Sequence, residues 1–453
     1  MKLRSGIVCS VKATLVFNLL FAAGAAVSKA DGFYLDPQSA EGMSVAQAGM
    51  PTGYKDGSAA YYNPAALTLH DRYGLSLQAH YLSSSARFDN DGSTVGSESN
   101  IGDDSINGGR EGLIPTVYSV VPLDNGMVGG LYVNSPFGLG TKYSDDWVGR
   151  YQNIETLMRT VNIGASIGGE VVDGLSLGIG FSAIYTDVKL RSAIDVGSIA
   201  TQALGPSNAL ALGLSPQRSD GFADIESADW GYGWNAGLLY TFDKEQENRF
   251  GISYRAATDI EFHGGSVRYS LPAAATPLTE SGAFQATSAR SKITLPEMVS
   301  LGGRIALSDS VALVQQTTWT RWSRARAIDI SFENPAQMPL NERLDWNDSW
   351  LYSIGFTGRL WEPVELRIGT AYETGVVPSV DRRSPRMPTS AGVWTTIGIG
   401  LVVPDTGITI DLTYARLEFL GGAAGTVGPT GDNLSGDWDS YNQAVSLAAS
   451  YTW

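Results

Sequence analysis

Cysteine is almost absent from this sequence. One cysteine, Cys9, occurs in 453 residues, and it lies ahead of the apolar run that ends near residue 27. A lipoprotein anchor needs its cysteine after such a run, and disulfides or cysteine-based metal and catalytic sites need thiols in the mature chain. We therefore expect a mature protein without a thiol, a disulfide or a cysteine-based metal or catalytic site. We also expect no other metal and no cofactor.

Long hydrophobic runs are also missing after the first 30 residues. Lys2, Arg4 and Lys12 precede an apolar stretch, and Ser28 and Ala30 flank a small-x-small cleavage site. This arrangement predicts a signal peptide over residues 1–30. Without it, 27 Lys and Arg face 46 Asp and Glu, a net charge of −19, which disfavours nucleic acid as a partner.

The composition excludes a bundle of membrane helices. The mean hydropathy is −0.05, and the chain contains 53 Gly, 20 Tyr and 11 Trp. Abundant glycine and aromatic residues indicate many short strands joined by turns.

The strand-like segments alternate with period two. In the stretch 175–185, the odd positions are Leu, Leu, Ile, Phe, Ala and Tyr, and the even positions are mostly Ser and Gly. A soluble sheet usually carries charges on its solvated face. Here the second face carries mostly small or uncharged polar residues, and the apolar face often begins or ends on Tyr or Trp. This pattern predicts a transmembrane β-barrel with lipid outside, a lumen inside and aromatic girdles at both interfaces, rather than a large soluble β-protein.

Fourteen such segments can be counted, which suits a closed up-and-down barrel of antiparallel strands. The connections between these segments alternate between tight turns and longer, polar links such as 83–111, 191–229 and 328–348. The segments are 72–82, 112–123, 126–134, 156–170, 173–190, 230–243, 248–264, 286–306, 309–327, 349–361, 362–375, 391–403, 406–420 and 441–453.

The chain stops on an aromatic residue. Val445, Leu447 and Tyr451 share one face of the last segment with Trp453. We interpret Tyr451 and Trp453 as the C-terminal signal for the barrel assembly machinery, with the barrel occupying residues 71–453.

Residues 31–70 do not alternate. They are rich in Ala and Tyr and are broken by Pro37, Pro51 and Gly53. We expect a small helical hatch that plugs the lumen; the alternative is a flexible periplasmic extension, although disordered tails are seldom so rich in Ala and Tyr.

Several motifs resemble a known family. They occur in order along the mature chain: Gly32-Phe33, "QSAEGMSVAQAG", "YYNPAAL", "NSPFGLGTKY", "WVGRY", "ITLPEMVSLG", "TWTRWS" and "RRSPRMP". This set is similar to the long-chain fatty acid transporters of Gram-negative outer membranes, the FadL/TodX (OmpP1) proteins. Thr389, Ser390 and Ala391 depart from the family pattern after the last motif, which bears on the identity of the ligand.

The resemblance implies a 14-stranded barrel with an N-terminal hatch that carries hydrophobic compounds. Ligands would be caught in an outer groove and pass to an apolar pocket reached by the mature N-terminus. A kink in the third strand would open a side exit toward the membrane.

The candidate ligand-binding residues are Phe33, Lys189, Arg191, Arg324 and Arg326. By the resemblance, Phe33 lines the pocket, and a basic side chain would bind a carboxylate head group. The alternative for the four basic residues is a place at the membrane rim, facing lipopolysaccharide phosphates.

Two motifs have structural interpretations. Asn63, Pro64 and Ala65 are expected to form an element of the hatch, or an ordinary turn before the first strand. Pro136 and Gly138 are expected to deform strand three at a lateral opening, or to begin a loop, because proline cannot donate to a strand ladder.

The leading hypothesis is an outer-membrane channel that carries long-chain fatty acids by ligand binding and passive diffusion past the hatch. We expect the transport to be downhill, since no energy source is visible in the sequence. Aromatic or alkane hydrocarbons are the second choice, and a general porin or a structural, adhesive barrel are competing classes. We expect no enzyme, since nothing near the three histidines marks a nucleophile. The expected protein is a monomer in contact with outer-membrane lipid and lipopolysaccharide.

Overall fold

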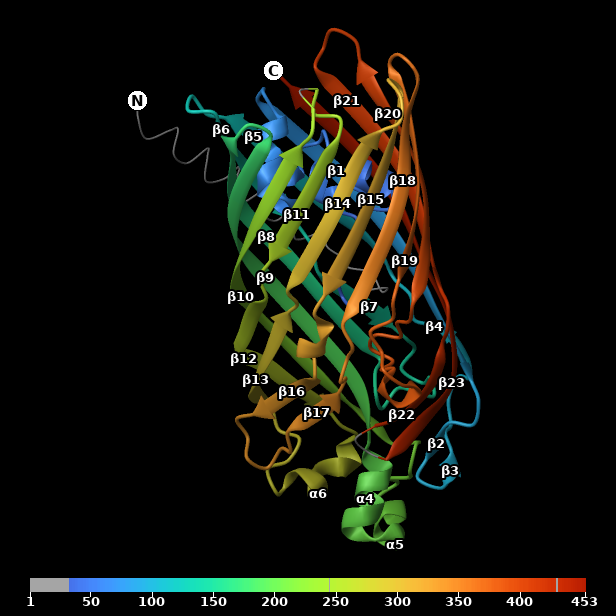
Figure 1. Ribbon diagram of the computed structural model, residues 1–453. Helices are drawn as coiled ribbons and strands as arrows, with labels where there is room; N and C mark the ends of the chain where they lie inside the picture. Colours follow the sequence, from blue (N-terminus) through green and yellow to red (C-terminus); the bar gives the residue numbers. More distant parts are fainter. Residues whose placement is uncertain (1–31, 244, 429–430) are drawn as a thin grey trace.

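The computed structural model describes residues 32–243, 245–428 and 431–453. They form a closed antiparallel barrel of 14 strands, which confirms the predicted fold class (Figure 1). Several strands consist of two elements separated by a break.

The first seven strands are β1 (Gly74–Asn90), β5 (Glu111–Pro122), β6 with β7 (Met127–Asn134 and Gly138–Lys142), β8 (Glu155–Val172), β9 (Leu175–Asp195), β10 (Asp220–Thr241) and β11 with β12 (Arg249–Arg255 and Thr258–Ser270). The other seven are β13 with β14 (Thr287–Leu295 and Met298–Ala306), β15 with β16 (Val311–Thr320 and Ala327–Phe332), β17 with β18 (Leu340–Arg343 and Ser349–Trp361), β19 (Val364–Glu373), β20 (Gly392–Val403), β21 (Ile408–Phe419) and β23 (Asp432–Thr452).

The first and last strands close the barrel. β1 pairs with β23 from Gly74 opposite Thr452 to Asn90 opposite Gly436. The N–H of Trp453 donates to the C=O of Tyr73 at 3.0 Å, and the two aromatic rings stack with centroids 5.9 Å apart. Closure leaves no strand edge to face lipid, which is what a sheet in a bilayer requires.

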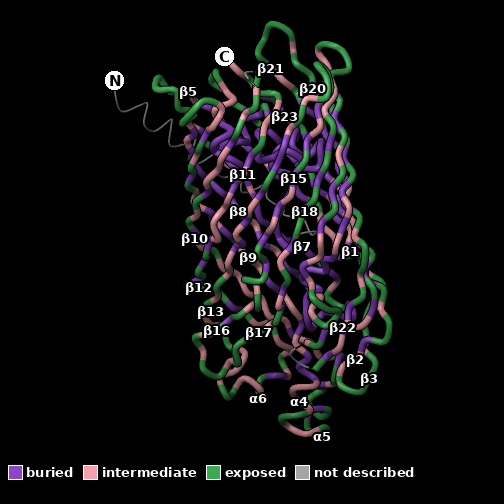
Figure 2. Tube along the Cα trace, viewed as in Figure 1, coloured by how far each residue is buried: buried purple, intermediate pink, exposed green. Residues whose placement is uncertain are grey.

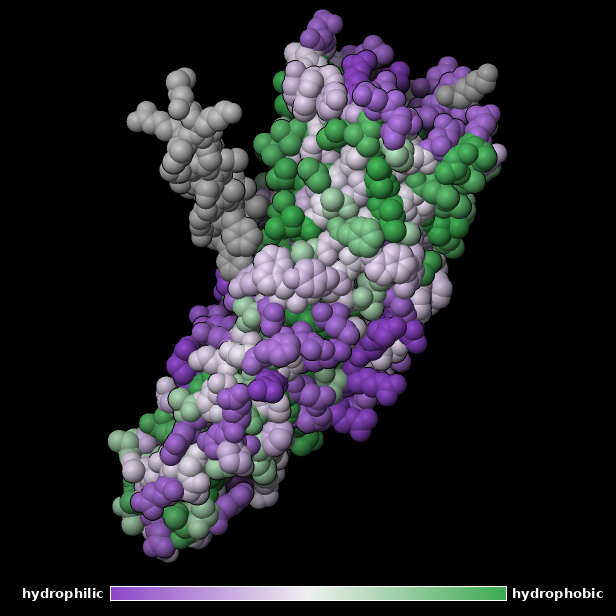
Figure 3. Space-filling view, turned by 90° about the vertical axis from the view of Figure 1, so that its left-hand side faces the viewer, coloured by the Kyte–Doolittle hydropathy of each residue, from purple (hydrophilic) through white to green (hydrophobic). Residues whose placement is uncertain are grey.

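The two faces of the strands differ as the alternation predicts. In β23, Leu447 is 53% exposed whereas its neighbours Ser446 and Ala448 are buried. Buried residues lie inside the barrel in Figure 2, and apolar side chains gather on the outer face in a band nearer one end in Figure 3. That band is the lipid-facing surface of an outer-membrane barrel.

The two ends of the barrel are unlike. Tight links such as 123–126, 173–174 and 362–363 meet at one end, together with the C-terminus; we call it the turn end. The other, the loop end, carries α4 (Val196–Leu204), α5 (Pro206–Ala211), η3 (Ala273–Ala275), α6 (Thr276–Thr279), the short strands β2 (Thr94–Val95), β3 (Glu98–Ser99), β4 (Ser105–Asn107) and β22 (Ala423–Val427), and η5 (Val380–Arg382).

The strands extend further toward the loop end than the sequence pattern indicated. β1 continues to Asn90, β10 begins at Asp220 and β23 at Asp432, within stretches expected to be loops. Apolar alternation stops where the wall leaves the hydrocarbon layer, but ladder hydrogen bonds need no apolar side chains and continue beyond it.

Residues 32–69 run inside the barrel as short helical pieces: α2 (Ala40–Ser44), η1 (Met50–Thr52), α3 (Ala59–Tyr62) and η2 (Pro64–Leu69). Every residue from 32 to 67 except Lys55 is buried. We call residues 32–69 the N-terminal segment. No helix among the described residues is long and apolar enough to cross a membrane.

Candidate functional site

An apolar cavity of about 320 Å³ lies in the loop-end half of the lumen. Its volume falls at the lower end of the roughly 300–1,000 Å³ typical of small-molecule sites. Inward-facing side chains of several strands form most of its apolar lining: Leu139, Met158, Val188, Leu190, Ile225, Phe262, Ala289, Ile293, Ile328 and Ile330. Leu344 and Met387 complete it from segments between strands.

Phe33 lines this cavity from the N-terminal segment. Its ring packs edge-on against Trp322, with centroids 4.6 Å apart, and Trp322 in turn packs against Trp346 at 5.4 Å. A Cβ on Gly32 would lie 2.8 Å from the Trp322 ring, so the chain approaches this indole closely only because residue 32 is glycine. The aromatic contacts fix the end of the N-terminal segment against the cavity.

Two of the predicted basic residues, Arg324 and Arg326, also line the cavity. Arg324 lies 3.4 Å from the Glu297 carboxylate. Arg326 forms no salt bridge with any described residue, which leaves its guanidinium able to bind an anion.

Lys189 and Arg191 lie elsewhere. Both are on the outward face of β9, on the same side as Phe181, while Leu190 between them faces the cavity. Lys189 pairs with Glu155 at 3.1 Å and Arg191 with Asp145 at 3.2 Å. Their expected place in the ligand pocket is therefore wrong, and the rim position that was the alternative matches their orientation.

Strand three is interrupted where Pro136 lies. β6 ends at Asn134 and β7 begins at Gly138, and the N-terminal segment pairs with the break. The Leu35 N–H donates to the Pro136 C=O at 2.9 Å, and the Gly138 N–H donates to the Phe33 C=O at 2.8 Å. β5 pairs with β6 only as far as Val117 opposite Val133, so the ladder between strands two and three is interrupted beside the break.

Asn63 anchors the middle of the N-terminal segment. Its side-chain N–H donates to the Leu238 C=O on β10 at 3.1 Å and to the C=O of Pro51, and its Oδ1 accepts from the Ala65 N–H at 3.1 Å. Pro64 starts η2, where its missing N–H costs no helical hydrogen bond. The Asn63-Pro64-Ala65 motif is thus a contact between the N-terminal segment and the barrel wall.

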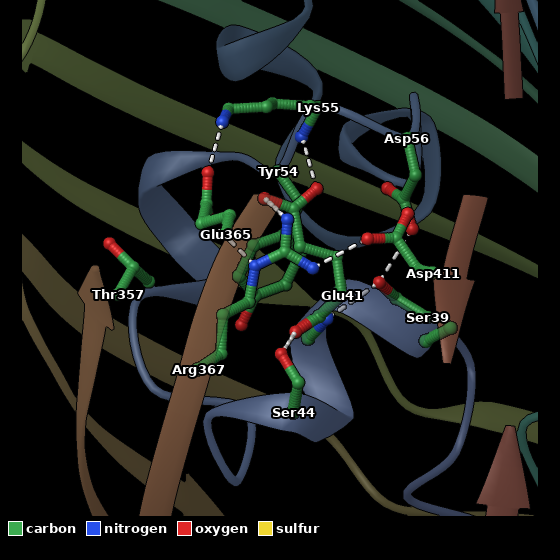
Figure 4. Close-up of polar contacts among 12 residues, drawn as sticks. Ser39, Glu41, Ser44, Tyr54, Lys55, Asp56, Thr357, Glu365, Arg367 and Asp411 are labelled. Atoms are coloured by element: carbon green, nitrogen blue, oxygen red, sulfur yellow. Dashed lines mark hydrogen bonds and ion pairs between the residues drawn. The ribbon is translucent and has the colours of Figure 1, made fainter. Parts of the chain in front are cut away.

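A buried charged cluster binds the N-terminal segment at Glu41 of α2 and at Lys55 (Figure 4). Arg367 of β19, only 2% exposed, binds Asp411 of β21 at 2.6 Å and Glu365 at 2.7 Å, and lies 3.8 Å from Glu41 of α2. The Lys55 backbone N–H donates to the Glu41 carboxylate at 2.8 Å. Burial raises the pKa of Glu41 to about 7, against the opposing effect of Arg367.

Sequence reasoning missed Trp322, Arg367 and Asp411. Each occupies an inward position of a segment that was identified correctly, and a charged residue within a membrane-crossing strand marks a paired or functional position. Extending the alternation by two residues from Thr320 would have placed Trp322 in the lumen.

Comparisons with known proteins agree with this geometry. A family model described as "Outer membrane protein transport protein (OMPP1/FadL/TodX)" matches residues 21–453. The chain belongs to the OMPP1/FadL/TodX family. It is therefore an outer-membrane transporter of hydrophobic compounds, as the motifs predicted, and members of the family are transporters or channels.

Relatives within the family cover most of the chain. Outer membrane protein P1 of Haemophilus influenzae is 27% identical over 89% of both chains, and the long-chain fatty acid transport protein of Escherichia coli O6:H1 is 26% identical over 84% of this chain and 86% of its own. Among solved structures, a FadL homologue of Pseudomonas aeruginosa has a TM-score of 0.83 at 21% identity, covering 93% of this chain and 99% of that one. The Pseudomonas putida toluene transporter TodX has a TM-score of 0.66 at 16% identity, with the same coverage.

Proposed function

We propose that this OMPP1/FadL/TodX protein carries long-chain fatty acids, and that the apolar cavity is where they bind. The observation that carries this proposal is the combination of an apolar lining with Arg326, which has no salt-bridge partner among the described residues. An alkyl chain gains by leaving water, and a carboxylate that leaves water needs a charged hydrogen-bond donor. The cavity offers both.

The N-terminal segment acts in this proposal as a hatch. It fills the lumen on the turn-end side of the cavity, and its first residues bridge the break in strand three. In this proposal, Phe33 leaves Trp322 and Leu35 leaves Pro136. The cavity is then connected with the interrupted ladder between strands two and three. A bound chain would then leave sideways into the membrane, with no energy source beyond its concentration gradient.

A neutral aromatic hydrocarbon is the second candidate ligand. Phe33 and Phe262 line the cavity with aromatic rings, and Trp322 packs against Phe33. Such rings pack well against a flat aromatic molecule. A neutral ligand would make no use of Arg326, so the two candidates are separable by mutation.

Replacing both Arg324 and Arg326 by alanine is expected to weaken oleate binding by roughly 10- to 100-fold, because a charge-assisted hydrogen bond contributes about 1.5–3 kcal/mol. Binding of oleyl alcohol, which has the same chain without the charge, should change little. Displacement of a fluorescent fatty acid from the purified protein measures both affinities.

The matched control replaces Lys189 and Arg191, which lie on the outer face, by alanine. It should bind oleate like the parent protein. Equal oleate affinities in the cavity variant and this control would contradict the proposal, as would loss of oleyl alcohol binding in parallel with loss of oleate binding.

A further inference from the structure

The ladder between strands eight and nine is interrupted. β13 pairs with β16 as far as Ser291 opposite Ile330, and β14 pairs with β15 from Met298 opposite Thr320. Between these points residues 292–297 face residues 321–329, so one side of the break is three residues longer. Among the described residues, one backbone hydrogen bond crosses it, from the Arg321 N–H to the Glu297 C=O at 3.0 Å.

The local sequence explains the interruption. Pro296 has no N–H and cannot donate across the ladder. On the other side, Trp322–Arg324 forms a single 3-10 turn that takes up the additional residues and turns the fully buried Trp322 inward. The break is therefore a built feature of these two strands.

The apolar cavity reaches this break. A strand that lines a cavity only with its inward face contributes every second residue. Here consecutive residues from both strands line the cavity, 289–294 on one side and 324–330 on the other. Outward-facing Thr294 and Ala327 are among them, so the cavity lies between the two strand edges. We call this opening, bounded by residues 292–297 and 321–329, the side window.

The side window lies just outside the lipid-facing band. Trp319, on the outward face of β15, is two residues from Arg321 along the same strand, and aromatic residues mark the membrane interface. Charged residues follow on both sides of the window: Arg321 pairs with Glu297 at 2.7 Å and Lys292 with Asp259 at 2.8 Å. The opening therefore faces the polar head-group layer at the loop-end surface of the membrane.

We propose that the side window is a lateral entrance through which anionic amphiphiles pass from the head-group layer into the cavity. The alkyl chain moves between Thr294 and Ala327 into the apolar lumen, while the head group stays at the rim beside Arg326. This inference rests on the proposed function for the identity of the ligand. It differs from the break in strand three in position, since it lies on strands eight and nine. Phe33 contacts both places, because its C=O accepts from the Gly138 N–H and its ring packs against Trp322.

The test uses a cysteine in the cavity as a reporter. Met158→Cys places a thiol on β8, where Met158 lines the cavity and is 3% exposed. The purified protein in liposomes is treated with N-dodecylmaleimide, and alkylation is followed by mass spectrometry. Tryptophan at both Thr294 and Ala327 should slow alkylation roughly tenfold, because access then waits for the two side chains to move.

The matched control places tryptophans at Leu301 and Thr317, which are paired across the intact ladder of the same two strands. It should react as fast as the reporter alone. If the window variant does not fold, as judged by heat-modifiable gel mobility, Ala327→Phe alone gives the milder obstruction. Equal rates in the window variant and the control would overturn the proposal.

Oleate affinity, measured on the reporter protein without added tryptophans, separates the two hypotheses. If the tryptophans slow alkylation but the reporter protein does not bind oleate, the entrance is supported and fatty acids are rejected as the cargo. Oleate binding with an unchanged rate would support the cargo and reject the entrance.

Discussion

Replacing Arg367 by methionine is expected to lower the free energy of unfolding by about 3–5 kcal/mol, the usual cost of removing one partner from a buried ion pair. Arg367 is the central cation of the cluster that joins β19, β21 and the N-terminal segment. Without it, Asp411, which is 3% exposed, loses its partner, and Glu41 loses its nearest guanidinium. Urea or thermal unfolding of the reconstituted protein measures the loss.

Two further variants identify the cause. Arg359, 58% exposed and 3.6 Å from Glu362, is a surface arginine of the preceding strand, and its replacement by methionine should cost less than about 1 kcal/mol. Adding Glu41→Gln and Asp411→Asn to Arg367→Met should restore part of the stability, because the acids left without a partner are then neutral. Equal losses for Arg367→Met and Arg359→Met would show that the cluster does not hold the segment.

Valine at Gly178 and Gly251 together is expected to raise ion conductance through the barrel roughly tenfold or more, toward the behaviour of an open porin. Both glycines lie on the inner face of the barrel wall, directly against the N-terminal segment. A Cβ would lie 2.3 Å from the Pro64 carbonyl carbon at Gly178 and 2.1 Å from the Pro51 oxygen at Gly251. The segment cannot stay seated against these side chains, whereas the strands themselves favour valine. Planar-bilayer recordings measure the current.

Gly129→Val is the matched control, because the nearest atom to its added Cβ is a backbone oxygen at 3.7 Å on the neighbouring strand. Its current should remain as low as that of the parent protein. Large, steady currents through the parent protein itself would contradict a plugged lumen and favour a general porin.

Much of the fold could be predicted because a barrel in lipid repeats one local rule. Alternation along each strand identified the membrane-crossing segments, and the first and last of them pair as expected. The same rule was not applied to Lys189 and Arg191, whose odd positions match Phe181 and not the inward Leu190. A basic residue near a strand end was taken as a ligand from its charge and from its approximate place in the family pattern, without regard to the face on which it lies.

Other features depend on relations between strands. The side window exists because two neighbouring strands differ in length between fixed pairs, and no periodicity within either strand reports that difference. The contact of Arg367 with Glu41 joins residues 326 positions apart in the chain. In contrast, Phe33 was expected to line the ligand pocket, because its motif stands at the start of the mature chain, and it does line the apolar cavity.

Uptake of radiolabelled oleate tests the central claim most directly. The recipient is an Escherichia coli strain that lacks its own long-chain fatty acid transport protein and expresses this chain in the outer membrane. We expect oleate uptake well above that of cells with an empty vector, and a clear reduction when Arg324 and Arg326 are both alanine. Uptake no greater than in the empty-vector cells, with the folded barrel present in the outer membrane, would contradict the account.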